Sequence, residues 1–162
     1  MKYGVVSTTR RRVVLTTPYF IPDDALLQAM QTAVLRGVDV HLIVSAKKDQ
    51  FLVCLAQQSY YEELLEKGVQ VHLYEGNFLH AKHLSIDDNL ALVGSSNMDI
   101  RSFALNAEVS VLVYSPEFVR QLQTEQMRYF SHCRLLTLSE WRARSGWSRF
   151  GQNMARLMSP LL

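Results

Sequence analysis

The stretch VVLTTPYFIPDDALLQAMQTAVLRGVDVHLIV, residues 13–44, holds two apolar runs on either side of an amphipathic segment. The second run, Val38–Val44, is apolar enough for a buried strand. Between the runs, Asp23 or Asp24 can cap a helix, and Gly37 suits the left-handed residue at its C-terminus. The stretch therefore predicts a strand, a helix and a second strand.

The same alternation continues down the chain. Phe51–Lys67 has the spacing of a helix, and residues 69–74 alternate apolar and polar side chains like a strand with one polar face. A turn-forming triplet at 87–89 predicts a hairpin between strands at 81–86 and 90–93. The remaining expected elements are a strand over 106–113 and a helix over 116–132. Short connections favour parallel neighbours, so we expect an α/β fold with a mixed, mostly parallel sheet flanked by helices on both faces.

The composition is that of one ordinary globular domain. Of the 162 residues, 48% are hydrophobic and 20% are charged, which excludes disorder, collagen and coiled coil. No apolar run approaches the ~20 residues of a membrane span, and two cysteines cannot build a disulfide framework. The formal charge of +2 combines +4 in residues 1–22, +5 in residues 128–162 and −7 between them. The basic ends either meet an anionic surface or are solvated faces of the domain.

A set of polar residues between positions 80 and 108 suits phosphodiester chemistry. An extended strand turns every second side chain to one face, so His80 and Lys82 project together about 6–7 Å apart. The same period puts Ser95 and Asn97 on one side, and Glu108 lies on the polar side of the next expected strand. Lys82 and Asn97 can hold the non-bridging oxygens of a phosphate and neutralise charge in the transition state. This chemistry requires no metal and no other cofactor.

His80 can supply the reacting group. Histidine side chains can both give and take a proton near neutral pH, so this residue type can attack phosphorus or protonate a leaving alkoxide. Glu108 could hold the other imidazole nitrogen and so fix the tautomer. His83 faces away from His80 on a strand, so we do not expect these two residues to bind zinc together.

Other candidates each have two explanations. Asp87 completes the spacing of the motif and is counted with the catalytic residues, although its place in the turn triplet predicts a structural hydrogen bond. Tyr19 and Phe20 follow the first strand, where they could line a substrate pocket or pack in the core. Arg101 could contact a substrate head group or pair with an acid. The Arg- and Trp-rich residues 138–162, expected to be helical, could lie on a membrane or pack on the domain.

The pattern H-x-K-x4-D at 80–87, followed by G-S-x-N at 94–97, resembles the HKD motif of the phospholipase D superfamily. The chain is most similar to the C-terminal half of bacterial cardiolipin synthases. We therefore expect a phospholipase D-like domain over 12–137, a tail over 138–162, and residues 1–11 outside the resemblance. The strings that carry it are TPYFIPD (17–23), RGVDV (36–40), GSSNMDIRSF (94–103), LNAEV (105–109) and ARLMSPLL (155–162).

The resemblance implies a phosphatidyltransferase. Such an enzyme moves a phosphatidyl group between two phosphatidylglycerol molecules through a phosphohistidine, releasing glycerol. The resemblance places His80, Lys82, Ser95, Asn97 and Glu108 around the phosphate, with His80 as general acid and base. It gives the aspartate of the motif a supporting part.

The synthases carry two HKD motifs, whereas this chain carries one. We expect the partner to be a second half in the same polypeptide. A homodimer that builds a shared site, acting as a phosphodiesterase or nuclease, is one alternative, and an inactive membrane-binding fragment is another. The leading interpretation involves no nucleic acid. It implies a peripheral position at anionic phospholipid, on the cytoplasmic side of the bacterial inner membrane.

Overall fold

A seven-stranded sheet organises the computed structural model, in the order β8-β6-β5-β1-β3-β4-β9. The structure describes residues 6, 8–47, 50–99, 107–145, 151–152 and 154–156. The strands of this sheet are β1 (Arg12–Thr16), β3 (Asp39–Ser45), β4 (Gln70–Tyr74), β5 (His83–Ile86), β6 (Leu90–Gly94), β8 (Ser110–Tyr114) and β9 (Cys133–Leu135). A two-stranded parallel sheet pairs β2 (Phe20–Ile21) with β7 (Met98–Asp99).

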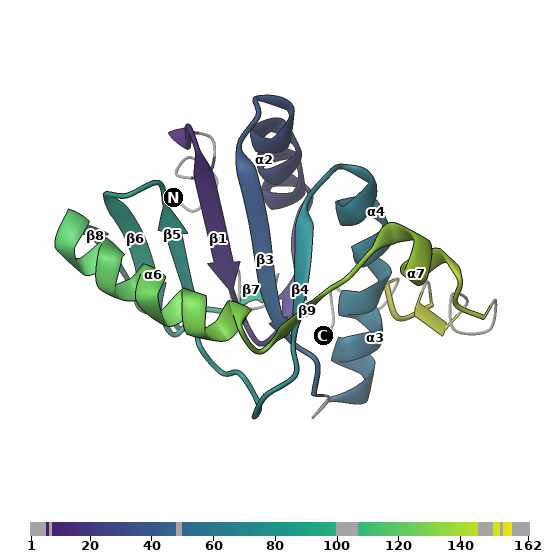
Figure 1. The fold of residues 1–162 in the computed structure, drawn as a ribbon. Coiled ribbons are helices and arrows are strands. Elements are labelled where there is room, and N and C mark those ends of the chain that lie inside the picture. The colour runs from purple at the N-terminus through teal and green to yellow at the C-terminus, as the bar shows by residue number, and fades with distance from the viewer. Residues whose placement is uncertain are drawn as a thin grey trace.

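Helices cover both faces of the large sheet, which confirms the expected layering. Helix α6 crosses one face, and α2, α3 and α4 lie on the other (Figure 1). The described helices are α2 (Asp24–Leu35), α3 (Phe51–Ser59), α4 (Tyr61–Glu66), α6 (Pro116–Phe130) and α7 (Leu138–Arg142). The helix predicted over 51–67 is thus divided at Tyr60 into α3 and α4.

The opening strand–helix–strand unit forms as predicted. Strands β1 and β3 pair in parallel, with Val13 opposite Val40. Asp23 is the residue that caps α2, because its side chain accepts a hydrogen bond from the Leu26 amide at 2.9 Å. Gly37 follows the helix with a φ of +81°, a left-handed conformation that costs glycine little.

The expectation of a mostly parallel sheet was wrong. Among the described strand pairs of the large sheet, β1–β3 and β3–β4 are parallel and the other four pairs are antiparallel. The predicted hairpin forms between β5 and β6, and its first strand pairs antiparallel with β1. Strand β9, which the sequence pattern did not predict, adds an antiparallel edge beside β4.

The core has a large part under α2, α3 and α4 and a smaller part under α6. The α6 side contains a polar network around Gln126, whose side chain is almost fully buried. Gln126 accepts a hydrogen bond from the Ser85 hydroxyl at 2.7 Å and lies 3.3 Å from His83 Nδ1. The His83 ring also stacks on Tyr129. His83 therefore helps to seat α6, on the face away from the HKD residues.

The described part of the C-terminal tail, residues 138–145, 151–152 and 154–156, packs on the domain, which is the second of the two expected arrangements. The Trp141 side chain is buried against Tyr61 of α4, with ring centroids 5.2 Å apart. The tail arginines pair with acids of α4: Arg142 with Glu62 and Glu66, Arg144 with Glu62, and Arg156 with Glu63. Within the described ranges, no helix has the length and apolar character needed to cross a bilayer.

Candidate active site

His80 and Lys82 come together in the extended segment that leads into β5. This segment lies at the edge of the sheet where β1 and β3 also end, the lower edge in Figure 1. The Lys82 ammonium lies 3.1 Å from His80 Nε2 and 3.3 Å from Nδ1, and it donates to the His80 carbonyl at 3.0 Å. The predicted common face of these two residues is thus observed.

Ser95 and Glu108 approach each other just beyond the paired ends of β6 and β8. The Ser95 hydroxyl donates to the Glu108 carboxylate and accepts from the Val109 amide at 3.1 Å. Gly94 permits this approach, because a Cβ there would lie 2.4 Å from the Val109 carbonyl oxygen and 2.8 Å from Ser110 Cα. We expected the Glu108 carboxylate to hold the imidazole of His80. In the structure this carboxylate instead accepts a hydrogen bond from the Ser95 hydroxyl.

The electrostatics link Lys82 to two carboxylates. Burial lowers the pKa of the Lys82 ammonium below its usual value, and the negative charges of Glu108 and Asp99 oppose that shift. Asp99 is 8% exposed and lies on β7, opposite Ile21 of β2. Sequence analysis did not single out Asp99, because it is the parallel pairing of β2 with β7 that brings this residue to the site.

Asn97 is held between Ser95 and β7. The next amide, that of Met98, donates to the Thr17 hydroxyl at 3.2 Å, and this hydroxyl donates to the Tyr19 carbonyl at 2.7 Å. The Asn97 side-chain oxygen is enclosed and has no hydrogen-bond partner among the described residues. This oxygen can only accept a hydrogen bond, so any contact of Asn97 with a phosphate oxygen would have to come from its side-chain nitrogen.

An aromatic pair borders the His80 ring. The Phe78 ring lies 5.8 Å from the His80 ring and 6.3 Å from the Tyr19 ring, measured between centroids. Tyr19 is therefore close to the site, as its position after β1 suggested. Phe20 is not: its side chain is fully buried in the core, and its amide donates to Gln57. Phe78 was missed, although its place two residues before His80 on an extended segment was a usable signal.

Asp87 lies at the opposite end of β5 from His80, which corrects its inclusion among the catalytic residues. Its carboxylate accepts from the backbone amides of Arg11 at 2.8 Å, Arg12 at 3.0 Å and Arg10 at 3.1 Å. Burial tends to raise the pKa of Asp87, but these three bonds and the charge of Arg11 hold it below the usual value. The residue joins the β5–β6 turn to the start of β1.

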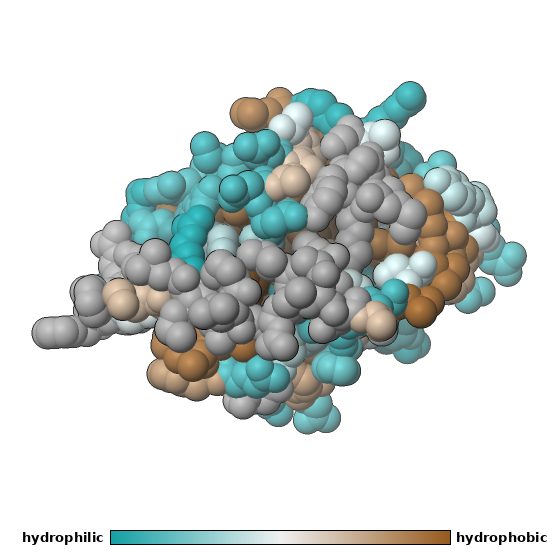
Figure 2. Space-filling model, turned by 180° about the vertical axis from the view of Figure 1, so that it is seen from behind, coloured by the Kyte–Doolittle hydropathy of each residue, from teal (hydrophilic) through white to brown (hydrophobic). Residues whose placement is uncertain are grey.

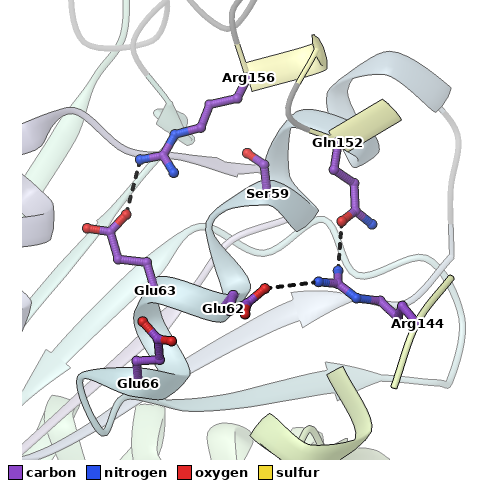
Figure 3. A pocket seen from close by; sticks show the side chains of 7 residues that line it. All are labelled: Ser59, Glu62, Glu63, Glu66, Arg144, Gln152 and Arg156. Carbon is purple, nitrogen blue, oxygen red and sulfur yellow. Dashed lines mark hydrogen bonds and ion pairs between the residues drawn. The ribbon is translucent and has the colours of Figure 1, made fainter. Parts of the chain in front are cut away.

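The remaining predictions concern regions away from these contacts. Arg101 lies outside the described residues. In the described part of the chain, no three His, Cys, Asp or Glu side chains are grouped to hold a metal ion. A polar hollow of about 270 Å³ lies between α3, α4 and the tail (Figure 3). It shares none of its described lining with the HKD motif, and its glutamates pair with tail arginines, so it belongs to the packing of the tail.

Comparison with known proteins assigns these features to a family. Residues 5–130 match the family described as the phospholipase D-like domain of cardiolipin synthase. The chain belongs to this cardiolipin synthase family. Cardiolipin synthase A of Proteus mirabilis is 40% identical over 157 residues, which cover 97% of this chain and 32% of that protein. The match to the family takes in residues 5–11, which sequence analysis left outside the resemblance.

Solved structures confirm the fold. The phosphatidylserine synthase of Haemophilus influenzae superposes with a TM-score of 0.81 at 19% identity, over 99% of this chain and 44% of that one. Nuc of Salmonella typhimurium, described as a phospholipase D family member, gives a TM-score of 0.71 at 17% identity over 83% of this chain and 88% of that one. The cardiolipin synthase domain described here spans about a third of the length of the cardiolipin synthases it matches.

Proposed function

We propose that this chain is part of a cardiolipin synthase, a phosphatidyltransferase with two HKD motifs. This chain is the half that supplies the second motif. The observation that carries the proposal is the grouping of His80, Lys82, Ser95 and Glu108 at one edge of the sheet. The substrate class comes from the named relatives, which match almost the whole chain at 35–40% identity. The reaction joins two phosphatidylglycerol molecules into cardiolipin and releases glycerol.

His80 serves this reaction as general acid and base. In the first half-reaction, the histidine of the other motif forms a bond to phosphorus while the bond from phosphorus to the glycerol oxygen breaks. His80 donates its proton to that oxygen. In the second half-reaction, His80 takes the proton of the incoming hydroxyl, whose oxygen bonds to phosphorus as the phosphohistidine bond breaks.

The surrounding residues hold the phosphate. Lys82 neutralises the non-bridging oxygens, and the charges of Glu108 and Asp99 favour its ammonium form. Asn97 donates from its amide to the same oxygens, and Ser95 orders Glu108. The partner is a second HKD half at the surface of an anionic membrane, with this chain peripheral to the cytoplasmic side of the bacterial inner membrane. No metal or cofactor enters the mechanism.

The test uses this chain joined to a first motif-bearing half, supplied with phosphatidylglycerol vesicles. We expect cardiolipin and glycerol in equal amounts, and a rate at least ~10³-fold lower in His80→Ala, because the protonation step is lost. His83→Gln is the matched control, since its ring lies on the other face of the sheet and a glutamine keeps a polar group beside Gln126. Failure to form cardiolipin, or an undiminished rate in His80→Ala, would contradict the proposal.

A second candidate is a homodimeric phosphodiesterase. It is favoured by the superposition on Nuc, because this chain covers 88% of that phospholipase D family member. Two copies would then supply the two histidines that the chemistry needs. This alternative predicts cleavage of a chromogenic phosphodiester in the presence of chelator, by the chain alone. A monomeric mass in light scattering at assay concentrations would count against it.

A further inference from the structure

Three exposed apolar side chains lie at the edge of the sheet that carries the candidate active site, and one of them, Phe78, borders it. Phe51 and Leu52 begin α3 and are 66% and 47% exposed, and Phe78 is 37% exposed in the segment between β4 and β5. We call these three residues the apolar rim. Single exposed apolar residues are common on soluble domains, so the rim carries meaning only if it shares one surface with the site.

Ring contacts place Phe78 at the site, and the chain path places the start of α3 at the same edge of the sheet. Phe78 lies between His80 and Tyr19, and Tyr19 leads into β2, against which α3 packs. The amide of Ala46, in the loop before α3, donates to the carbonyl of Tyr74 at the end of β4. The loops that carry Phe78 and lead into α3 thus leave from adjoining strand ends, at the lower edge of Figure 1. Figure 2 shows brown, apolar atoms at the lower left, where its rotated view brings the start of α3.

Positive charge accompanies the rim. Exposed Lys47 lies in the loop between β3 and α3, and Lys82 lies in the site itself. Among the described acids nearby, Glu75 pairs with an arginine of β9. Glu108 and Asp99 act on Lys82 within the site. The edge therefore presents apolar side chains next to ammonium groups, the combination that suits the surface of an anionic bilayer.

We propose that the apolar rim inserts into an anionic phospholipid bilayer, so that His80 and Lys82 meet the phosphates at its surface. The inference rests on the proposed function, because it takes the substrate to be an amphiphile. A phospholipid carries its apolar chains next to its phosphodiester, and this edge carries the rim next to the site.

The experiment measures binding without turnover. This chain is mixed with vesicles of equal parts phosphatidylglycerol and phosphatidylcholine, and the bound fraction is read by flotation. We expect the double variant Phe51→Ser/Leu52→Ser to lower the partition coefficient on the order of 30-fold, because two largely exposed apolar side chains lose their insertion. Leu35→Ser is the matched control. Leu35 is the last residue of α2 and is 88% exposed, at the edge of the sheet opposite the site. Its replacement should therefore change binding less than about twofold.

A reporter at the rim gives the location. The chain already carries two tryptophans, so each spectrum is compared with that of the unmodified chain. The emission added by Phe51→Trp should shift to the blue and be quenched by brominated phosphatidylcholine, whereas the emission added by Leu35→Trp should do neither. Circular dichroism of each variant checks that the fold is unchanged. Phe51 and Leu35 both lie at exposed helix ends, so the two tryptophan variants should differ little in the free energy of unfolding.

Several results would overturn the inference. They are absence of vesicle binding by the unmodified chain, a double variant that binds as well as the unmodified chain, or an unquenched Phe51→Trp. A change of mass in light scattering in the double variant would mean that the rim is covered by a second copy. Loss of oligonucleotide binding alone would mean a nucleic acid partner. The proposed function fails separately, by absence of cardiolipin synthesis in the two-motif protein, whatever the vesicle binding.

Discussion

Replacing Asp87 with alanine should destabilise the fold while leaving the chemistry intact. The change removes the acceptor of three backbone amides and leaves alanine at a φ of +47°, in the left-handed region. Each hydrogen bond lost at this partly exposed turn costs about 0.5–1 kcal/mol, and the left-handed conformation costs alanine about 1 kcal/mol. We therefore expect the free energy of unfolding to fall by about 3 kcal/mol.

Two further variants separate the terms of that sum. Asp87→Gly removes the three bonds without the left-handed penalty, so it should cost about 2 kcal/mol. Asp87→Asn tolerates the left-handed region and keeps an oxygen in the place that accepts from Arg11 and Arg12, so it should cost about 1 kcal/mol. The assay is urea unfolding of the chain, followed by far-ultraviolet circular dichroism.

The pH dependence of the free energy of unfolding tests the hydrogen bonds of Asp87 independently. A carboxyl whose pKa is lower in the folded state stabilises the fold above its unfolded pKa, and that stability is lost as pH falls through the folded pKa. The pKa of Asp87 is held low in this way, so the difference between the unmodified chain and Asp87→Asn should narrow below about pH 4. The reasoning is refuted if Asp87→Gly is as stable as the unmodified chain. It is also refuted if Asp87→Asn slows phosphatidyl transfer as much as His80→Ala does.

Three more predictions follow from other contacts. Gly94→Ala should lower the free energy of unfolding by about 2 kcal/mol in urea titration, because its Cβ meets the backbone of the facing strand. Glu108→Gln should move the alkaline limb of the transfer rate to lower pH, because removing this charge lets burial lower the pKa of Lys82 further. His41 and His72, whose ring nitrogens are 3.1 Å apart, have pKa values lowered to about 4, first by burial. Unfolding free energy should fall as pH drops from 6.5 towards 4, and it should fall less in His41→Asn/His72→Asn.

The parts of the fold that sequence predicted are those with local signals. Asp23 caps α2 through a bond three residues away, and Gly37 ends the helix through its own backbone conformation. The period of two likewise sufficed to put His80 and Lys82 on one face. Each signal depends on residues that are close in the chain, so no knowledge of the tertiary arrangement was needed.

The parts that sequence missed depend on pairing between distant segments. Strand β9 is short and exists only because it pairs with β4, and no periodicity could show which strand β5 would join. The charge of Asp99 acts on Lys82 because β7 pairs in parallel with β2, a strand that lies far from it in the sequence. Glu108 was expected to bond the imidazole of His80, but its carboxylate bonds the Ser95 hydroxyl, because residue types do not predict which bonds form inside a pocket.

The uneven charge of the chain also has an intramolecular explanation. The basic C-terminal region suggested a membrane contact. In the structure, however, Arg142, Arg144 and Arg156 form ion pairs with glutamates of α4. Arginines that are paired in this way have less charge to offer an anionic bilayer, so the tail is a poor choice for the surface that meets lipid. The apolar rim lies instead at the edge that carries Lys82. If lipid binds this domain, the phosphate-binding edge and the membrane-facing edge are therefore the same.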